Sequence, residues 1–181
     1  DGEVRYFLIP SRGSANGFGV AGFVADTAFS VDRGFYQQPF ELTITSATEG
    51  AAVWFTVDGT KPSPDNPGAS RFLAPLAIDR STVVRAVAYW DGWQPTNIDT
   101  QTYLFLADVV RQPEEPEGFP TSWGNGPGVQ STMPARADYE MDPRVVNAAP
   151  FTDLEGEEFS MEDALLAIPT MSLVMDIDEL L

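Results

Sequence analysis

The sequence predicts an all-β fold: an immunoglobulin-like antiparallel β-sandwich of about seven strands over residues 29–105, followed by an irregular acidic C-terminal extension with one or two short helices and a final strand. Apolar and polar residues alternate in short runs, which is typical of half-buried strands. Turn-forming pairs such as Asp58–Gly59 and Asp91–Gly92 end these runs. The runs recur at roughly 8–12-residue intervals, the spacing expected of a sandwich.

The run Ala52–Val57 is the centre of the predicted sandwich. Val53, Phe55 and Val57 share one face of this strand, and the residues between them share the other. The run ends at Asp58–Gly59, because this pair tolerates the positive φ angles that a tight reversal needs.

The other strands follow from the same alternation. Phe40, Leu42 and Ile44 alternate with polar residues and are predicted to point inward. The 58–70 loop contains three prolines and two glycines, so it is not a central strand, and Pro75 makes the run around it an edge element. The expected strands are Phe29–Val31, Phe35–Tyr36, Phe40–Thr45, Ala52–Val57, Phe72–Ile78, Thr82–Trp90 and Asn97–Phe105.

Two segments precede the sandwich. Residues 1–17 hold one short predicted strand, Val4–Ile9, which Pro10 ends. A lone strand is not stable, so residues 1–17 are expected to be the terminal strand of a preceding β domain. Residues 18–28 are predicted to form a small-residue linker. The linker residues expected to pack on the sandwich are Val20, Phe23 and Val24.

After Phe105 the pattern changes. Residues 106–160 are predicted to form an acidic linker rich in proline and glycine, and residues 161–181 to begin a downstream domain with a helix and a strand. Ser160 and Asp163 form a capping box ahead of the predicted helix Met161–Ala167. Further expected elements are a helical or extended exit at Leu106–Gln112, a loop at Trp123–Gly128, a helix at Pro143–Asn147 and a strand at Thr170–Met175.

The composition excludes several kinds of chemistry. The chain of 181 residues contains no cysteine and no histidine. Disulfides, thiol catalysis, zinc sites built on Cys or His, and histidine acid–base mechanisms are therefore excluded. The hydrophobic content of 43% is that of a chain with a packed core.

The charge is strongly negative and uneven. The net charge is −17, and residues 106–181 alone hold sixteen acids and three bases. This sign repels nucleic acid and anionic lipid, so neither is an expected partner. The acidity is interpreted first as a source of solubility.

The ends of the chain bear on its context. It begins at Asp1 without Met or a signal peptide, and it stops after an apolar run. It is therefore expected to be a piece of a longer secreted or cell-surface polypeptide whose neighbouring domains are its partners. No run of roughly eighteen apolar residues is present, so no membrane insertion is expected.

Trp54, Trp90 and Trp93 are the candidate carbohydrate-binding residues, with Tyr89 beside them. Flat aromatic rings stack on the apolar faces of pyranose sugars. The alternative is that these rings serve core or inter-domain packing, which is the commoner use of aromatic residues in sandwiches and is preferred here.

Asp58, Asp65 and Asn66 are the candidate calcium ligands, because they offer oxygen atoms within one proline-rich loop. The spacing does not match an EF-hand, so turn formation is the preferred interpretation. No other cofactor is expected.

Two further patterns are rejected as catalytic sites. Adjacent acids such as Glu157–Glu158 point apart, whereas a glycosidase holds two carboxyl groups at a defined separation. Gly124, Gly126 and Gly128 lack the Lys-Ser/Thr of a phosphate-binding loop. No catalytic residue is assigned, and this chain is not expected to be an enzyme.

The order of several motifs resembles the chitobiase/β-hexosaminidase C-terminal domain family. The matching residues are Phe55-Thr-Val-Asp-Gly-Thr-Lys-Pro62, Ala74-Pro-Leu-Ala-Ile78, Thr82-Val-Val-Arg-Ala-Val-Ala88, Gly92 and Thr102-Tyr103. The resemblance covers residues 29–105 and departs from the family at Val57, where threonine is usual. It implies an immunoglobulin-like accessory module with a non-catalytic, architectural role.

The flanking segments carry two weaker resemblances. Tyr6-Phe-x-x-Pro-x-x-Gly-x-Ala-Asn-Gly17 resembles the closing strand of a lamin-tail-type domain. Asp138–Asn147 and Ile168–Asp176 resemble the lead-in to a CotH kinase-like domain. The resemblance implies no activity here, because this chain contains no ATP-binding loop or catalytic motif of that family.

Three functions are therefore weighed. The preferred one is a non-catalytic structural or interaction module of a large secreted or cell-surface bacterial protein. The first alternative is a carbohydrate-binding accessory module, and its partner would be a glycan or a cell-surface protein. The second is the non-catalytic N-terminal part of a CotH kinase-like enzyme.

Overall fold

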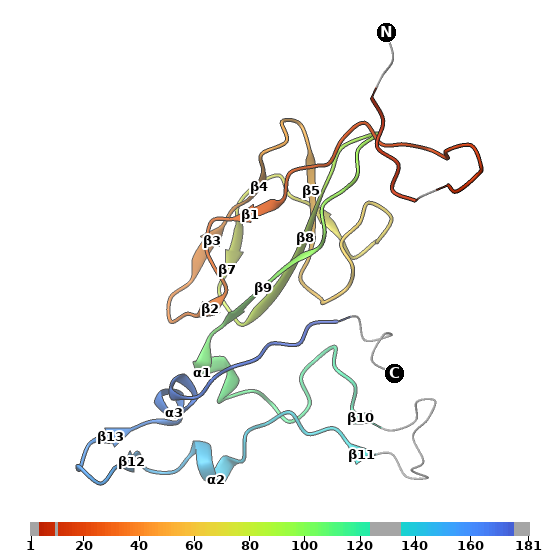
Figure 1. Ribbon diagram of the computed structural model, residues 1–181. Coiled ribbons are helices and arrows are strands. Elements are labelled where there is room, and N and C mark those ends of the chain that lie inside the picture. Colours follow the sequence, from red (N-terminus) through yellow and green to blue (C-terminus); the bar gives the residue numbers. More distant parts are fainter. Residues whose placement is uncertain (1–3, 10, 124–134, 176–181) are drawn as a thin grey trace.

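The computed structural model describes residues 4–9, 11–123 and 135–175, and its centre is a two-layer β-sandwich with the C-terminal extension packed beside one end (Figure 1). The strands of the sandwich are β1 (Thr27–Phe29), β2 (Gly34–Phe35), β3 (Phe40–Leu42), β4 (Ile44–Ser46), β5 (Ala52–Thr56), β6 (Ser70–Arg71), β7 (Leu76–Ile78), β8 (Thr82–Tyr89) and β9 (Asp99–Leu104). The extension holds α1 (Leu106–Val109), β10 (Ser122–Trp123), β11 (Ala135–Arg136), α2 (Pro143–Val146), β12 (Phe151–Thr152), β13 (Glu158–Phe159) and α3 (Met161–Ala167).

One layer is a five-stranded sheet in the order β2-β9-β8-β5-β6, antiparallel except for the parallel pair β2 and β9. In the other layer, β3 pairs with β7 and β4 pairs with β1, both antiparallel. Thr43 separates β3 from β4, and its carbonyl oxygen accepts a hydrogen bond from the Ser30 amide at 2.9 Å. The predicted strand Phe40–Thr45 is therefore one run divided between two partner strands.

The core lies between the two layers. Leu42 and Ile44 point inward from β3 and β4, as predicted, and alternate residues of β8 meet them from the five-stranded sheet. Removing this apolar surface from water is the main force that holds the layers together. The immunoglobulin-like sandwich predicted from the sequence is confirmed. The buried members of the core are Val24, Leu42, Ile44, Val53, Ile78, Val84, Ala86, Ala88, Tyr103 and Phe105.

Several strand predictions need correction. The strand expected at Phe29–Val31 is Thr27–Phe29, which pairs with β4. Val4–Ile9 forms no strand, and its only ladder contact is a bridge between Tyr6 and Val20. β5 stops at Thr56, whose hydroxyl donates to the Thr60 carbonyl at 2.7 Å, so Val57 enters the turn and half of its surface is exposed. The predicted strand Phe72–Ile78 is strand only at Leu76–Ile78, because the chain crosses there from the five-stranded sheet to the opposite layer.

The segment before the sandwich is fixed to it. Val24 is buried in the core, as expected, and its amide donates to the Gln94 carbonyl at 2.9 Å. Phe23 forms a parallel bridge with Gln94 but remains half exposed. The Ala25 amide donates to Thr48 Oγ1 at 2.8 Å. Residues 20–25 are therefore docked on the sandwich.

The extension contains local structure. The Asp142 side chain accepts from the Arg144 amide at the start of α2, and Ser160 and Asp163 form the predicted capping box of α3. Arg136 on β11 makes salt bridges with Glu114 and Glu115 at 2.9 and 3.0 Å. Of the predicted loop Trp123–Gly128, Trp123 instead ends β10 opposite Ala135, and the rest lies outside the described residues, as do the three rejected glycines. No helix in the described part of the chain is long and apolar enough to cross a membrane.

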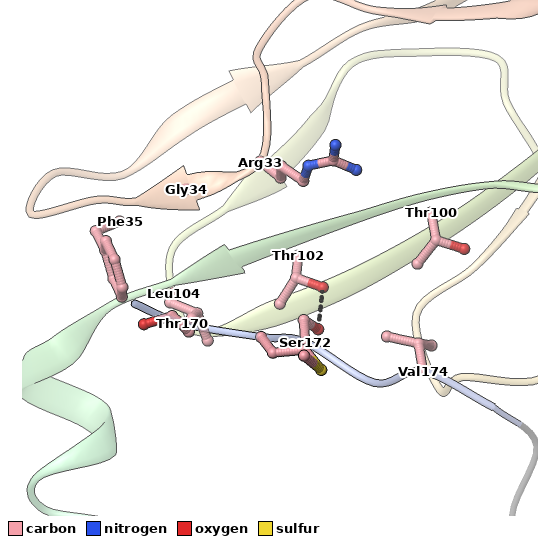
Figure 2. Close-up of a pocket in the computed structure, with 10 residues that line it drawn as sticks. Arg33, Gly34, Phe35, Thr100, Thr102, Leu104, Thr170, Ser172 and Val174 are labelled. Carbon is pink, nitrogen blue, oxygen red and sulfur yellow. Dashed lines mark hydrogen bonds between the residues drawn. The ribbon is translucent and has the colours of Figure 1, made fainter. Parts of the chain in front are cut away.

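The last described segment, Thr170–Met175, crosses the outer face of β9 (Figure 2). Ser172 Oγ lies 2.8 Å from Thr102 Oγ1, and the segment continues to the Gly59 turn. The prediction of a strand here is wrong: the segment lies against side chains on the face of β9, whereas a strand pairs through its backbone at an edge.

Candidate functional site

The three candidate tryptophans meet on the outer face of the sandwich, at one end of β5 and β8. They line an open cavity of about 500 Å³, here called the aromatic groove. This volume lies within the range of small-molecule sites, about 300–1,000 Å³. The lining residues are Gly50, Ala52, Trp54, Pro64, Tyr89, Trp90, Asp91, Gly92 and Trp93.

The strand register places two of the rings. Val53 and Ala88 are opposite one another and point into the core, so their neighbours Trp54 and Tyr89 point outward. Ala52 is opposite Tyr89, which leaves room between the two larger side chains. Pro64 in the loop after β5 supplies a wall of the groove.

The turn after β8 places the other two rings. The Trp93 amide donates to the Trp90 carbonyl at 3.0 Å, and Gly92 takes a φ of 73° between them. The turn is also tied to the segment before the sandwich: the Ala21 amide donates to the Gly92 carbonyl at 2.9 Å. Trp90 and Trp93 are thus held at the two ends of one anchored turn.

The groove can offer both stacking and hydrogen bonding. Trp90 is 41% exposed, and Trp54 and Trp93 are partly exposed. Within the described chain, none of the indole N–H groups of these tryptophans has a hydrogen-bond partner. Asp91 adds an exposed carboxylate at the rim, and Arg71 lies opposite Trp54 in the β5–β6 pair. Burial, and secondarily the charge of Asp65, raises the pKa of the Tyr89 hydroxyl, so it stays protonated at neutral pH and can donate.

The sequence named the three tryptophans but did not place them in one groove. Trp93 packs against the core, which agrees in part with the interpretation that these rings serve packing. Trp90 and Trp54 are outside the core cluster. Gly50 and Pro64 were missed, and no local pattern marks them, because they reach the groove only through the fold.

The candidate calcium ligands are engaged in a turn. Asp58 Oδ1 accepts from the Thr60 amide at 3.0 Å and from the Thr60 hydroxyl at 2.6 Å. Asn66 accepts from the Gly68 amide at 2.8 Å and donates to the Lys61 carbonyl at 2.7 Å. Across the described residues, no group of three or more Asp, Glu, His or Cys side chains could hold a metal ion. The geometry therefore favours turn formation.

Replacing Asp58 by alanine is expected to lower the free energy of unfolding by about 0.5–1.5 kcal/mol, because the turn loses two hydrogen bonds. Urea unfolding measures this loss. Asp65→Ala is the control, since that exposed side chain makes no hydrogen bond within the described chain. Its change should stay within about 0.5 kcal/mol. If millimolar calcium chloride raised the wild-type midpoint and either substitution removed the rise, calcium binding would replace turn formation as the explanation.

A second cavity, of about 600 Å³, lies between the last segment and β9 (Figure 2). Thr100, Thr102 and Leu104 line it from β9, and Arg33 and Phe35 from the region of β2. It holds no cluster of carboxylates or nucleophiles, and its polar groups are mainly threonine and serine hydroxyls. The aromatic groove is therefore the better candidate site.

The strand order and the packing of the two layers define an immunoglobulin-like β-sandwich module. Residues 31–100 match the family model of the chitobiase/beta-hexosaminidase C-terminal domain, a non-catalytic accessory domain of carbohydrate-active enzymes. The chain matches no curated protein and no solved structure. The resemblance to this family is thus supported, whereas those of the flanking segments to lamin-tail and CotH domains gain no support.

Proposed function

We propose that this chain is a carbohydrate-binding accessory module of a larger secreted or cell-surface protein, and that the aromatic groove is its binding site. The observation that carries the proposal is the convergence of Trp54 from β5 with Trp90 and Trp93 from the turn after β8 on a single open groove. The match of residues 31–100 to an accessory domain of carbohydrate-active enzymes supports it.

The chemistry of the groove suits a polyhydroxylated ligand. Indole and phenol rings offer flat apolar surfaces, and the free indole N–H groups donate to hydroxyl oxygens. The Asp91 carboxylate accepts from ligand hydroxyls. An open groove with no catalytic group binds a chain without cleaving it.

Isothermal titration calorimetry with cellohexaose, xylohexaose, mannohexaose and N-acetylglucosamine hexaose tests the proposal. At least one is expected to bind saturably, and Trp90→Ala should weaken that binding at least about tenfold, or 1.4 kcal/mol. Phe18→Ala is the matched control, because Phe18 is a fully exposed aromatic residue outside the groove. Absence of saturable binding across the panel, or equal effects of both variants, would contradict the proposal. A proline-rich peptide should be titrated too, since aromatic grooves also bind such peptides.

A second candidate function is to hold neighbouring domains in fixed geometry. It is favoured by the docking of both flanking segments, through Val24 in the core and Ser172 on Thr102. Because the chain has no cysteine, Phe18→Cys and Met171→Cys introduce two exposed labelling sites without background. Pulsed electron spin resonance should then give one narrow distance distribution. A broad distribution would show that the module does not fix its two ends.

A further inference from the structure

We infer that Gly22 and Gly50 are positioning residues of the aromatic groove, so that the segment preceding the sandwich is part of the binding site. The inference rests on the proposed carbohydrate site and deepens it. It concerns how the rings of Trp93 and Trp90 are held, which can be measured without any ligand.

Gly50 supports the ring of Trp90. A Cβ atom added at Gly50 would lie 2.4 Å from Cζ3 and 2.6 Å from Cη2 of Trp90. These distances are far inside van der Waals contact, so the six-membered ring lies directly against the glycine backbone. Gly50 also has a φ of 80°, a conformation that glycine adopts without strain. A side chain at this position would push the exposed indole away from its present place.

Gly22 supports the ring of Trp93 in the same way. A Cβ atom added there would lie 2.9 Å from Cζ3, 3.0 Å from Cε3 and 3.1 Å from Cη2 of Trp93. Gly22 is buried, and its carbonyl accepts from the Gln94 amide at 2.9 Å. The backbone therefore cannot retreat from the ring without losing that hydrogen bond.

The same segment fixes the turn that carries both rings. The Ala21 amide donates to the Gly92 carbonyl, and the Val24 amide donates to the Gln94 carbonyl. Residues 21–24 thus contact the turn on both sides of Trp93. A ligand that binds more tightly when Trp93 is in place stabilises the docked conformation of this segment. By linkage, the docked conformation raises the affinity for that ligand by the same factor.

The chain offers a matched control for each glycine. Gly17 lies in the same preceding segment, and an added Cβ would meet nothing within 4 Å. Gly156 has a φ of 88°, close to that of Gly50, and an added Cβ would again meet nothing within 4 Å. Gly22→Ala is therefore compared with Gly17→Ala, and Gly50→Ala with Gly156→Ala, which separates ring displacement from backbone strain.

The first readout is the set of indole N–H resonances in a ¹H–¹⁵N correlation spectrum of the full chain, which has four tryptophans. Trp93 should shift in Gly22→Ala and Trp90 in Gly50→Ala, while the control variants leave both unmoved. The second readout is the affinity for the four hexaoses by calorimetry, well below the unfolding temperature. Both groove variants should lose at least tenfold in affinity, and the controls less than twofold.

The outcomes separate the two proposals. If no hexaose binds the wild type but the indole signals shift as expected, the carbohydrate function fails and the positioning role stands. If a hexaose binds the wild type and Gly22→Ala leaves both the Trp93 signal and the affinity unchanged, the preceding segment is not part of the site. Should Gly22→Ala fail to fold, Gly50→Ala still tests the positioning role, because an unchanged Trp90 signal together with an unchanged affinity for a hexaose that binds the wild type would overturn the inference.

Discussion

Replacing Leu42 by alanine is expected to lower the free energy of unfolding by about 2–5 kcal/mol, the range for large-to-small substitutions in a packed core. Leu42 has no exposed surface and lies opposite Leu76 in the β3–β7 pair. Its side chain faces the five-stranded sheet, so the cavity would open between the two layers. The layers cannot close over it, because the strands on both sides are fixed by their ladders.

Urea unfolding measures the loss as a lower midpoint with an unchanged slope. Leu73→Ala is the matched control, because the same atoms are removed from a side chain that is 80% exposed. Its effect should stay within about 0.5 kcal/mol. Equal losses in the two variants would mean that the sandwich interior is not the stabilising core.

Leu42 also shows which features the sequence could predict. Its alternation with polar neighbours is a local pattern, and it correctly indicated both the strand and the buried face. The capping box before α3 is equally local, and the helix has the predicted bounds, Met161–Ala167. Such features depend only on residues that are close together in the sequence, so they can be predicted without knowing the fold.

Features that depend on distant partners could not be predicted. Thr170–Met175 has the alternation of a strand, yet it crosses the face of β9 through side-chain contacts and forms no ladder. Val4–Ile9 likewise lacks a partner strand among the described residues. The groove exists because Ala52 is opposite Tyr89, a residue 37 positions further along the chain.

Replacing Tyr103 by phenylalanine is expected to lower the free energy of unfolding by about 1–3 kcal/mol, the cost of leaving a buried polar group without its partner. Tyr103 is completely buried, and its hydroxyl donates to the Val31 carbonyl at 2.9 Å. The substitution keeps the ring and its edge-on contact with Phe40, at 5.3 Å between ring centres. The loss therefore isolates the hydroxyl. Tyr6→Phe is the control, since Tyr6 is about half exposed.

The same residue makes stability depend on pH, with a definite sign. Burial, and secondarily the neighbouring Tyr36 and Asp32, raises the pKa of Tyr103 well above its ordinary value of 10.0 in the folded state. Below pH 10 both states keep the proton, and the stabilisation is fully present. Above that pH the unfolded state loses the proton first, so the free energy of unfolding falls by up to about 1.4 kcal/mol per pH unit.

Urea unfolding at each pH measures this effect. The difference in the free energy of unfolding between wild type and Tyr103→Phe should be constant from pH 7 to 9 and shrink above pH 10. A difference that stays constant to pH 11 would mean that the Tyr103 hydroxyl ionises equally in both states, and that its burial between the two layers is not maintained in solution.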